Sequence, residues 1–303
     1  MGNPFRVCVV GGSNMDLVAT SFAAVRDCDS NPGKLTLNPG GVGRNIAENL
    51  QHLGVETHLI TVFGDDPFGE QIRASCRSSG MDLAGSAVYP GIRSGTYLCL
   101  NEPDGSLYAA VSDMDACDAV TPAFLAERQA ILDRADLVVA EANLPEESLR
   151  WLAEHCKAPL AMDPVSVPKS SRLISVLPRL TLIKPNLSEA RALTGCEGPQ
   201  ETAEALHRLG IPCVLVSLGA NGIWYCGAEG EACQPCIPAS VINTNGCGDA
   251  CFAACIRAYL EGMDLCAIAR MGQAAASLSA EYAGTVSPHL NWSGVLARAA
   301  EAI

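Results

Sequence analysis

Short apolar runs alternate with stretches of helical pattern along most of this 303-residue chain, and this alternation limits the fold more than any other feature. Strands that alternate with helices at this spacing are typical of a parallel sheet covered on both faces. We therefore expect an α/β fold with a mostly parallel central sheet. The expected strands are Val7–Val10, Thr57–Phe63, Leu137–Ala140, Leu160–Met162, Leu180–Ile183 and Val214–Leu218, and the expected helices cover 46–53, 68–79, 145–156, 170–178, 187–194 and 200–209.

One region interrupts the alternation. The runs Gly95–Asn101 and Ser106–Val111 flank Glu102–Gly105, whose Pro-Asp-Gly sequence favours a tight turn between two strands. Lys34–Asn38 is another short strand pattern with no helix before it. These pieces could pair into a small antiparallel sheet beside the main one. Such a sheet could be a lid over a cleft or an ordinary edge hairpin, and the pattern alone favours neither.

The charge distribution excludes some partners. The formal net charge is −13, and no cluster of Lys or Arg forms a basic stripe, so we expect no binding to a nucleic-acid polymer. This charge pattern does not exclude a nucleoside or a nucleotide as a substrate. No apolar run approaches the roughly 18 residues of a membrane span. The N-terminal segment Met1–Val7 lacks the apolar stretch of a secretion signal, so we expect a cytoplasmic protein without a membrane partner.

The chain holds 15 cysteines, an odd number that favours free thiols. Cys233 and Cys236 form a single CxxC pattern without a second pair, and Cys247, Cys251 and Cys255 recur on one helical face. We expect both sets to be small buried apolar residues and not a metal or redox site.

The segment Asn243–Asp249 carries the most specific chemistry. Its Gly-Cys-Gly-Asp turn enters a helix of small residues directly. Glycines and a helix N-terminus together direct backbone N–H groups at an anion. An acidic side chain at the rim would repel a simple anion, but it suits a base that removes a proton during phosphoryl transfer. We therefore expect Asp249 to be such a base.

Two further turns carry polar residues that could bind a ligand: one precedes a helix and contains Asn45, and the other follows the first strand and contains Asp16. Asn45 lies in the first helical turn after Gly40 and Gly41, where its amide could face a ligand; close packing is the alternative. The segment lacks the Gly-Lys-Ser/Thr of a phosphate-binding P-loop. Asp16 follows the first strand, where it could accept two hydrogen bonds from a vicinal diol such as that of ribose, or could cap a turn.

Two motifs near the later strands suit a nucleotide. Asn186 and Glu189 lie three residues apart at the start of a helix, where they could hold a hydrated Mg²⁺ and a phosphate, form a capping box, or do both. The glycine-rich turn Ser217–Gly222 follows a strand and could contact nucleotide phosphates or simply close a hairpin.

In this order, the motifs resemble those of the ribokinase-like (phosphofructokinase-B) family of carbohydrate and nucleoside kinases. The matching motifs are Asn14–Asp16, Gly40–Asn45, Asn186–Glu189 and Gly246–Asp249. The resemblance covers essentially the whole chain and implies a single domain, 1–303, with a three-layer αβα fold. It also implies a β-sheet lid at about 17–39 and 92–113 and a homodimer formed through that lid.

The resemblance also implies roles for particular residues. Asp249 would be the catalytic base, and the backbone amides of Gly246, Cys247 and Gly248 would form the anion hole. MgATP would be the phosphoryl donor, with Glu189 acting on Mg²⁺ through water. The acceptor would be held by Asn14, Asp16, Gly40, Gly41, Asn45, Asn143 and Lys169, and ATP by Asn186, Ser217, Gly219 and Gly222.

Within the family, the motifs are most similar to those of the pseudouridine kinases. The similarity lies in Ser30–Lys34 leading to Asn38–Ala47, and in Ser112–Met114, Asp163–Ser166 and Asn243. It implies that the acceptor is the 5′-hydroxyl of pseudouridine. Another sugar or nucleoside kinase, acting on ribose, uridine or adenosine, is the alternative within the family. A catalytically inactive regulator that binds nucleosides is a further alternative, against which the retained Asp249 argues.

The catalytic loop departs from the family pattern at three positions. Asn243 and Asn245 stand where many relatives have Asp and Thr, a region that helps to bind a monovalent cation in those relatives, so the resemblance leaves K⁺ activation open. Cys247 replaces a frequent Ala, but its backbone N–H would still be available, and its thiol would lie near ATP.

Overall fold

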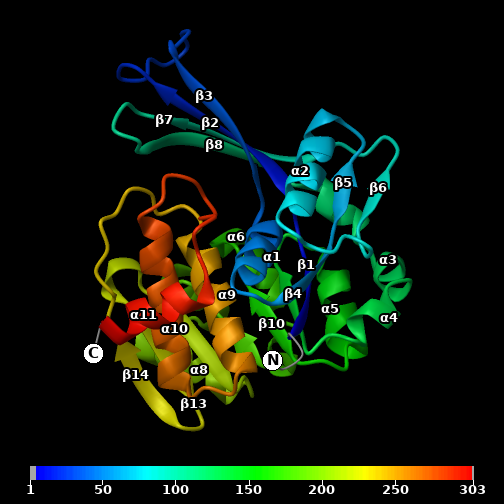
Figure 1. Ribbon diagram of the computed structural model, residues 1–303, viewed down its shortest axis with the longest axis vertical. Helices are drawn as coiled ribbons and strands as arrows, with labels where there is room; N and C mark the ends of the chain where they lie inside the picture. Colours follow the sequence, from blue (N-terminus) through cyan, green and yellow to red (C-terminus); the bar gives the residue numbers. More distant parts are fainter. Residues whose placement is uncertain (1–4, 302–303) are drawn as a thin grey trace.

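The computed structural model describes residues 5–301 and has three layers, with a central eight-stranded sheet between two layers of helices (Figure 1). The strand order is β14-β13-β12-β11-β10-β9-β1-β4. Strands β4 to β12 in this order run parallel, and β13 and β14 add an antiparallel hairpin at one edge. The expected α/β class and mostly parallel sheet are therefore confirmed.

The elements follow the expected alternation closely. The strands of the main sheet are β1 (Arg6–Val10), β4 (Glu56–Ile60), β9 (Leu137–Glu141), β10 (Leu160–Asp163), β11 (Leu182–Ile183), β12 (Cys213–Ser217), β13 (Ile223–Gly227) and β14 (Gly230–Gln234). The α-helices are α1 (Val42–His52), α2 (Pro67–Ser78), α3 (Pro122–Ala126), α4 (Gln129–Leu132), α5 (Glu146–His155), α6 (Val167–Ser170), α7 (Leu187–Thr194), α8 (Pro199–Arg208), α9 (Cys247–Leu260), α10 (Leu265–Ala280) and α11 (Trp292–Glu301).

The main sheet buries both of its faces, which is why its strands read as continuous apolar runs. In β1, Val7 and Val9 face a core formed with α1, α9, α10 and α11. Cys8 and Val10, on the opposite face of the same strand, pack in a second core with α5, α7 and α8.

A separate four-stranded sheet, here called the small sheet, projects from the main body (Figure 1). It consists of β3 (Gly33–Gly40), β2 (Asn14–Ser21), β7 (Gly95–Asn101) and β8 (Leu107–Asp113), in that order. The expected hairpin and the expected strand near 34–38 are both present. Strand β2 was not expected as a strand, because its first residues read as a polar turn after β1.

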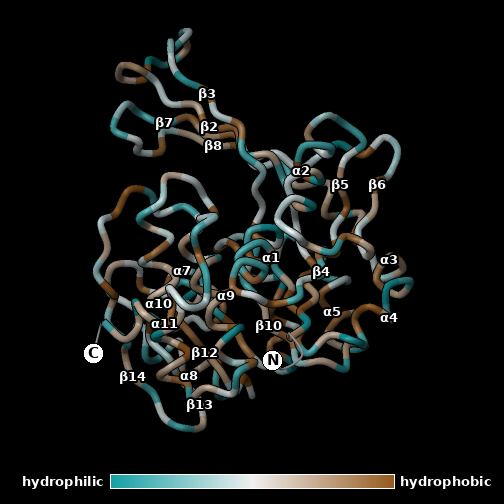
Figure 2. The backbone as a smooth tube through the Cα atoms, in the orientation of Figure 1, coloured by the Kyte–Doolittle hydropathy of each residue, from teal (hydrophilic) through white to brown (hydrophobic). Residues whose placement is uncertain are grey.

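The two faces of the small sheet differ in chemistry. Asp16, Tyr97 and Ser112 form one cross-strand row. The neighbouring row, on the opposite face, consists of Leu37, Leu17, Leu98 and Val111. Figure 2 shows the resulting hydrophobic stretches along β2, β7 and β8.

Two sequence expectations about secondary structure are wrong. The expected strand 57–63 is divided into β4 and β5 (Val62–Gly64), and β5 pairs with β6 (Ala87–Tyr89) in a two-stranded sheet. The division occurs because β1 ends at Val10, opposite Ile60, so the chain beyond has no main-sheet neighbour.

The second error concerns the expected helix 170–178. This segment contains only the end of α6 and two 3₁₀ turns, η2 (Ser171–Leu173) and η3 (Leu177–Arg179). Pro178 lacks a backbone donor and disfavours the helical conformation of Leu177, which accounts for the end of the segment but not for the 3₁₀ turn at its start.

The cysteines follow the expectation only in part. All 15 thiols are unpaired, and Cys251 and Cys255 are buried as expected, whereas Cys247, at the start of α9, is only partly buried. Cys233 and Cys236 are exposed, so the expectation that the CxxC pair is buried is wrong: the pair lies in and just after edge strand β14. Within residues 5–301, no three or more His, Cys, Asp and Glu side chains gather as a metal-ligand set.

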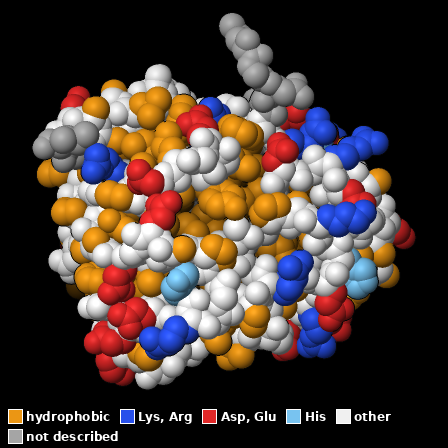
Figure 3. All heavy atoms as spheres, turned by 90° about the horizontal axis from the view of Figure 1, so that it is seen from below, with side chains coloured by type: hydrophobic (Ala, Val, Ile, Leu, Met, Phe, Trp, Pro, Cys, Tyr) orange, Lys and Arg blue, Asp and Glu red, His pale blue; other side chains and the backbone are white. Residues whose placement is uncertain are grey.

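The surface agrees with the charge pattern of the sequence. On the face shown in Figure 3, Lys and Arg side chains are interspersed with acidic ones, and no continuous basic stripe crosses it. Among the helices of residues 5–301, none is long and apolar enough to cross a membrane. Residues 1–4, which begin the segment that the signal-peptide expectation used, lie outside the described residues.

Candidate functional site

The glycine turn before α9 presents free backbone donors. Gly246 is the N-cap of α9 with φ 78°, and a Cβ atom there would lie 2.1 Å from the Thr285 carbonyl oxygen, so only glycine fits. Among the described residues, the N–H groups of Gly246 and Gly248 donate to no protein acceptor. The Cys247 N–H, which we expected to join the anion hole, is directed instead at the Thr244 carbonyl oxygen, 3.3 Å away. The N-terminus of α9 therefore offers donors for an anion, but one of the three expected ones is engaged within the turn.

Asp249 and Asn45 meet at the centre of the site. The Asn45 side-chain nitrogen Nδ2 donates a hydrogen bond of 2.9 Å to Asp249 Oδ2. The contact exists because α1 and α9 pack side by side and their first turns lie at the same edge of the main sheet. The structure thus brings together the two glycine-rich motifs that precede helices.

The environment of Asp249 suits a proton acceptor. Burial raises the pKa of its carboxyl to about 7, and the charge of Asp163 acts in the same direction, whereas the hydrogen bond from Asn45 and the ammonium of Lys184 oppose the shift. A carboxyl with a pKa near neutrality matches the pH at which a general base works best. Asp249 can therefore both accept a proton and release it at neutral pH.

Six of the seven residues expected to hold the acceptor line one cleft of about 520 Å³. It lies between the small sheet and the carboxyl ends of the main-sheet strands. The expected lining residues are Asn14, Asp16, Gly41, Asn45, Asn143 and Lys169. The cleft also contains residues that were not expected to bind the acceptor, namely Val42, Tyr97, Ser112, Met114, Val165, Ser166 and Pro168.

The seventh residue, Gly40, contributes by its lack of a side chain. A Cβ atom at Gly40 would lie 2.2 Å from Asp16 Oδ2, so any other residue would displace that carboxylate. Asn14 orients the same carboxylate by donating a hydrogen bond of 2.5 Å from Nδ2 to Asp16 Oδ1. Burial raises the pKa of Asp16, while Asn14 and the charge of Arg44 oppose the shift. Asp16 lines the cleft, and within residues 5–301 its Oδ2 accepts no hydrogen bond from the protein.

A second carboxylate, that of Glu141, links two loops that lead to residues of the cleft. Glu141 is fully buried, and its two oxygens accept hydrogen bonds from the backbone N–H of Gly12 at 2.5 Å and of Asn143 at 2.7 Å. It therefore ties the loop before Asn14 to the loop that carries Asn143. The side chain of Asn143 in turn accepts a hydrogen bond from Lys169 Nζ.

The residues expected to bind ATP gather on the other side of α9. Ser217, Gly219 and Gly222 line a largely apolar cavity of about 370 Å³ together with Cys247 and Gly248. Asn186, Ser217 and Gly219 line an adjoining hollow of about 510 Å³. The free N–H of Gly248 thus borders this cavity, while Asp249, one residue on, contacts the acceptor side through Asn45.

Asn186 and Glu189 form the capping box that the sequence left as one alternative. The Glu189 N–H donates to Asn186 Oδ1, and the Asn186 N–H donates to Glu189 Oε2, both at 2.9 Å. Burial and the nearby charge of Asp163 raise the pKa of Glu189. Because Oε1 takes no part in the capping box, the carboxylate retains an oxygen for a hydrated cation.

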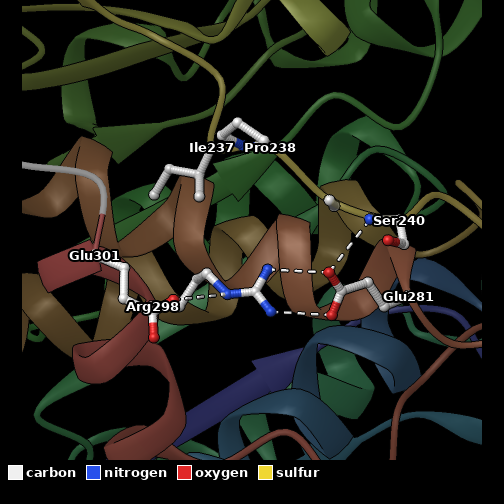
Figure 4. Close-up of a pocket in the computed structure, with 7 residues that line it drawn as sticks. Ile237, Pro238, Ser240, Glu281, Arg298 and Glu301 are labelled. Atoms are coloured by element: carbon white, nitrogen blue, oxygen red, sulfur yellow. Dashed lines mark hydrogen bonds and ion pairs between the residues drawn. The ribbon is translucent and has the colours of Figure 1, made fainter.

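The segment after β14 forms a wall of the 370 Å³ cavity and is held from its outer side. Ile237 and Pro238 line both that cavity and an outer hollow of about 460 Å³ (Figure 4). In the outer hollow, Arg298 pairs with Glu281 at 3.0 Å, and Glu281 accepts a hydrogen bond from the Ser240 N–H at 3.3 Å. The charged groups there pair with one another, which supports a structural role for the outer hollow.

Sequence reasoning missed several buried charges around the site. Arg44 lies within the recognised motif Gly40–Asn45 but was given no role, and neither Glu141 nor Lys184 was given one. A buried charge in an amphipathic pattern looks like a surface residue, so only the packing reveals it. Tyr97 and Ser112 could have been identified as cleft residues from the strand register alone, because they lie in one cross-strand row with Asp16.

Comparison with known proteins agrees with this arrangement. Residues 5–292 match the model of the pfkB family carbohydrate kinases. The chain is 32% identical to a pseudouridine kinase of Escherichia coli K12, with 96% of this chain and 95% of that protein covered. It is 28% identical to a ribokinase of Bacillus subtilis, covering 90% and 92% of the two chains.

Solved structures show the same fold. A carbohydrate kinase from Agrobacterium tumefaciens superposes with a TM-score of 0.86 at 30% identity, over 98% of this chain and 97% of that one. The central sheet between two layers of helices, together with the separate small sheet, is thus the ribokinase-like fold. The chain belongs to the pfkB family of carbohydrate kinases, phosphotransferases with an alcohol as acceptor.

Proposed function

We propose that the protein transfers the γ-phosphoryl group of ATP to the 5′-hydroxyl of pseudouridine. The observation that carries the kinase part is the position of Asp249, between the acceptor cleft and the free N–H groups at the start of α9. The similarity to a pseudouridine kinase at 32% identity supports this particular acceptor.

In the proposed reaction, an ionised Asp249 accepts the proton of the 5′-hydroxyl as that oxygen attacks the γ-phosphorus. The oxygen–phosphorus bond to the leaving ADP breaks, and the bond to the nucleoside oxygen forms. The N–H groups of Gly246 and Gly248 stabilise charge on the transferred group. The pKa of about 7 favours this role, because the carboxylate is ionised in a substantial fraction of molecules at neutral pH.

The acceptor cleft suits a ribosyl group with a base attached. Asp16 would accept hydrogen bonds from two ribose hydroxyls, and Asn14 holds it in place. Tyr97, Ser112 and Ser166 line the same cleft, and among the hydrogen bonds of residues 5–301 none involves their hydroxyl groups. A cleft of about 520 Å³ with these free hydroxyls fits a nucleoside better than a free sugar.

The donor would be MgATP. Glu189 Oε1, near Asn186 and the nucleotide cavity, would hold Mg²⁺ through water, and the raised pKa of this buried carboxyl indicates that a nearby cation would be favourable. When bound with ATP, Mg²⁺ neutralises charge on the phosphate oxygens.

The small sheet would serve as a lid and as a dimer contact. Its polar row faces the cleft, whereas Leu37, Leu98 and Val111 of the other face are exposed by 45%, 44% and 66%. An apolar face of this kind favours contact with the same face of a second copy. If so, Val111→Lys should convert a dimer in solution into a monomer, as measured by light scattering after size-exclusion chromatography.

The proposal is tested with a panel of acceptors and MgATP, scored by ADP release and product mass. Pseudouridine should give the highest kcat/KM, ahead of uridine, adenosine and ribose. A clear preference for one of these others would replace pseudouridine as the substrate while leaving the kinase assignment in place. No phosphoryl transfer to any acceptor, together with nucleoside binding, would favour the inactive regulator instead.

A further inference from the structure

Arg44 is a buried cation within the site that the proposed reaction leaves without a role. It lies on α1 between Gly43 and Asn45, and only 3% of its surface is exposed. Its guanidinium pairs with Glu48 at 2.8 Å, so its charge is compensated within the same helix. Burying a guanidinium is costly even when it is paired, and an apolar residue would pack there at lower cost. The remaining contacts of Arg44 must therefore account for its presence.

Those contacts join three parts of the fold. Nη1 donates to the Pro39 carbonyl oxygen of β3 at 3.0 Å, and Nη2 donates to Ser75 Oγ of α2 at 2.9 Å. Nη1 also donates to Asn45 Oδ1 at 3.3 Å. Arg44 thus links the small sheet to the side chain that contacts Asp249.

The direction of these hydrogen bonds matters. A guanidinium can only donate, so the Asn45 group facing Arg44 must be the oxygen Oδ1. The amide nitrogen Nδ2 must then face Asp249, whose ionised carboxylate can only accept. If the amide rotated by half a turn, two oxygens would face each other across the Asn45–Asp249 contact. Arg44 excludes that orientation.

We propose that Arg44 is a positioning residue. Because it is held by strand β3 and contacts Asn45, it fixes the orientation of the Asn45 amide, and through that amide the Asp249 carboxylate, relative to β3. This inference rests on the proposed role of Asp249 as the base. Pro39 lies opposite Met15 in the ladder between β3 and β2, next to the pair of Asp16 with Asn38. The same guanidinium therefore contacts the strand beside the acceptor site and the amide beside the base.

A double-mutant cycle tests the inference. Arg44→Met should lower kcat roughly 10- to 100-fold, the range expected when a reacting group is misplaced by about an ångström, while the KM for ATP stays within about twofold. In an Asn45→Ala background, where no amide needs orienting, Arg44→Met should change kcat by less than about threefold. Equal effects of Arg44→Met in both backgrounds would overturn the inference.

The pH profile of kcat gives a second readout. Because the Asn45 hydrogen bond lowers the pKa of Asp249, its loss in Arg44→Met should move the acidic limb of kcat to higher pH. The other charged groups that act on Asp249 are Asp163 on β10, Glu141 on β9 and Lys184 after β11, and all three are unchanged in the variant. An unshifted limb would contradict the inference.

Two further variants keep the test decisive. Ser75→Ala removes another partner of the same guanidinium and should leave kcat within about twofold, since Ser75 lines neither cavity. Arg44→Lys keeps the charge but lacks the fork that reaches two acceptors, so it should restore less than half of the lost kcat; full restoration would overturn the inference. If Arg44→Met fails to fold, Arg44→Lys carries the same cycle with Asn45→Ala. Additive effects refute only the role of Arg44. Undiminished turnover of Asp249→Asn would refute Asp249 as the base, and a lack of phosphoryl transfer by the unaltered protein would refute the proposed function.

Discussion

Lys184 Nζ lies 3.2 Å from Asp163 Oδ2, and both side chains are almost completely buried next to the first turn of α9. Burial disfavours the Lys184 ammonium, but the carboxylates around it, Asp163 foremost, more than offset this and raise its pKa. Lys184 also partly compensates the charges of Glu189 and Asp249. The ammonium of Lys184 therefore offsets part of the negative charge of Asp163, Glu189 and Asp249.

The first prediction concerns this ion pair. Lys184→Met should lower the free energy of unfolding by about 3–5 kcal/mol, because it removes the cationic partner of the buried Asp163 and leaves that side chain only the hydrogen bond from the Val165 N–H. Lys157→Met breaks an exposed pair with Asp133 and should cost about 1 kcal/mol or less. Urea unfolding of both variants measures the difference. Similar losses in the two variants would show that the buried pair carries no special stability.

The second prediction concerns the proposed base. Only the ionised form of Asp249 accepts a proton, so kcat should rise with pH through about 7, where its raised pKa lies, and then level off. Asp249→Asn should lower kcat about 100- to 10,000-fold, flatten this rise and leave ATP binding nearly intact. Steady-state kinetics from pH 5.5 to 9 and calorimetric ATP binding measure both effects. A variant that keeps near-wild-type turnover would exclude Asp249 as the base.

Sequence reasoning located the parts of the site but not how they meet. Gly246–Asp249 could be identified because its function is local: a glycine turn, a helix start and an adjacent acid. The contact between Asn45 and Asp249 joins residues that are 204 positions apart, and no local pattern encodes it. Only the resemblance to a family placed both in one site.

The limits on predicting the fold were also physical. The apolar run 57–63 matches one strand by composition, but pairing partners divide it after Ile60. Strand β2 was missed because Asn14 and Asp16 are polar and mask the apolar pattern of the strand. The buried charges Arg44, Glu141 and Lys184 resemble surface residues until the neighbouring elements are in place.

A third prediction separates the two substrates. Asp16→Ala should raise the KM for the nucleoside roughly 10- to 100-fold, the loss expected for hydrogen bonds to a charged acceptor, and change the KM for ATP far less. Asp113→Ala is the matched control, since Asp113 lies on the same sheet but lines neither cavity. Initial rates with each substrate varied in turn measure both constants. Equal effects on the two KM values would argue against a ribose contact.

A fourth prediction concerns backbone strain in the acceptor cleft. Val165 has φ 65°, a conformation that costs an L-residue about 1–2 kcal/mol. The turn is held by a hydrogen bond of 2.7 Å from the Ser166 N–H to the Pro164 carbonyl oxygen. Val165→Gly should be about 0.5–1 kcal/mol more stable than Val165→Ala, because both lose the packing of the valine side chain against the core and only glycine relieves the strain. Val165→Gly should also raise the nucleoside KM.

The comparison variant is Val165→Ala, which loses the same side-chain contacts with the cleft but retains most of the strain. It should raise the nucleoside KM to a similar extent but be the less stable of the two variants. Thermal unfolding of the two variants separates the effects. If glycine and alanine change stability equally, φ at this position stores no appreciable strain.

The last prediction concerns monovalent cations. Asn243 Nδ2 donates hydrogen bonds to the carbonyl oxygens of Ala283 at 3.0 Å and Gly284 at 3.4 Å, so an amide already occupies acceptors that a bound cation would need. We expect kcat to differ by less than about twofold between Na⁺ and K⁺ buffers of equal ionic strength. Asn243→Asp replaces the donor by a carboxylate that faces these two carbonyl oxygens, an arrangement of oxygens alone that a cation would stabilise. The variant should therefore lose activity in a buffer containing only a bulky organic cation and recover it on addition of K⁺. Strong K⁺ activation of the unaltered protein would show that the amide does not stand in for the cation.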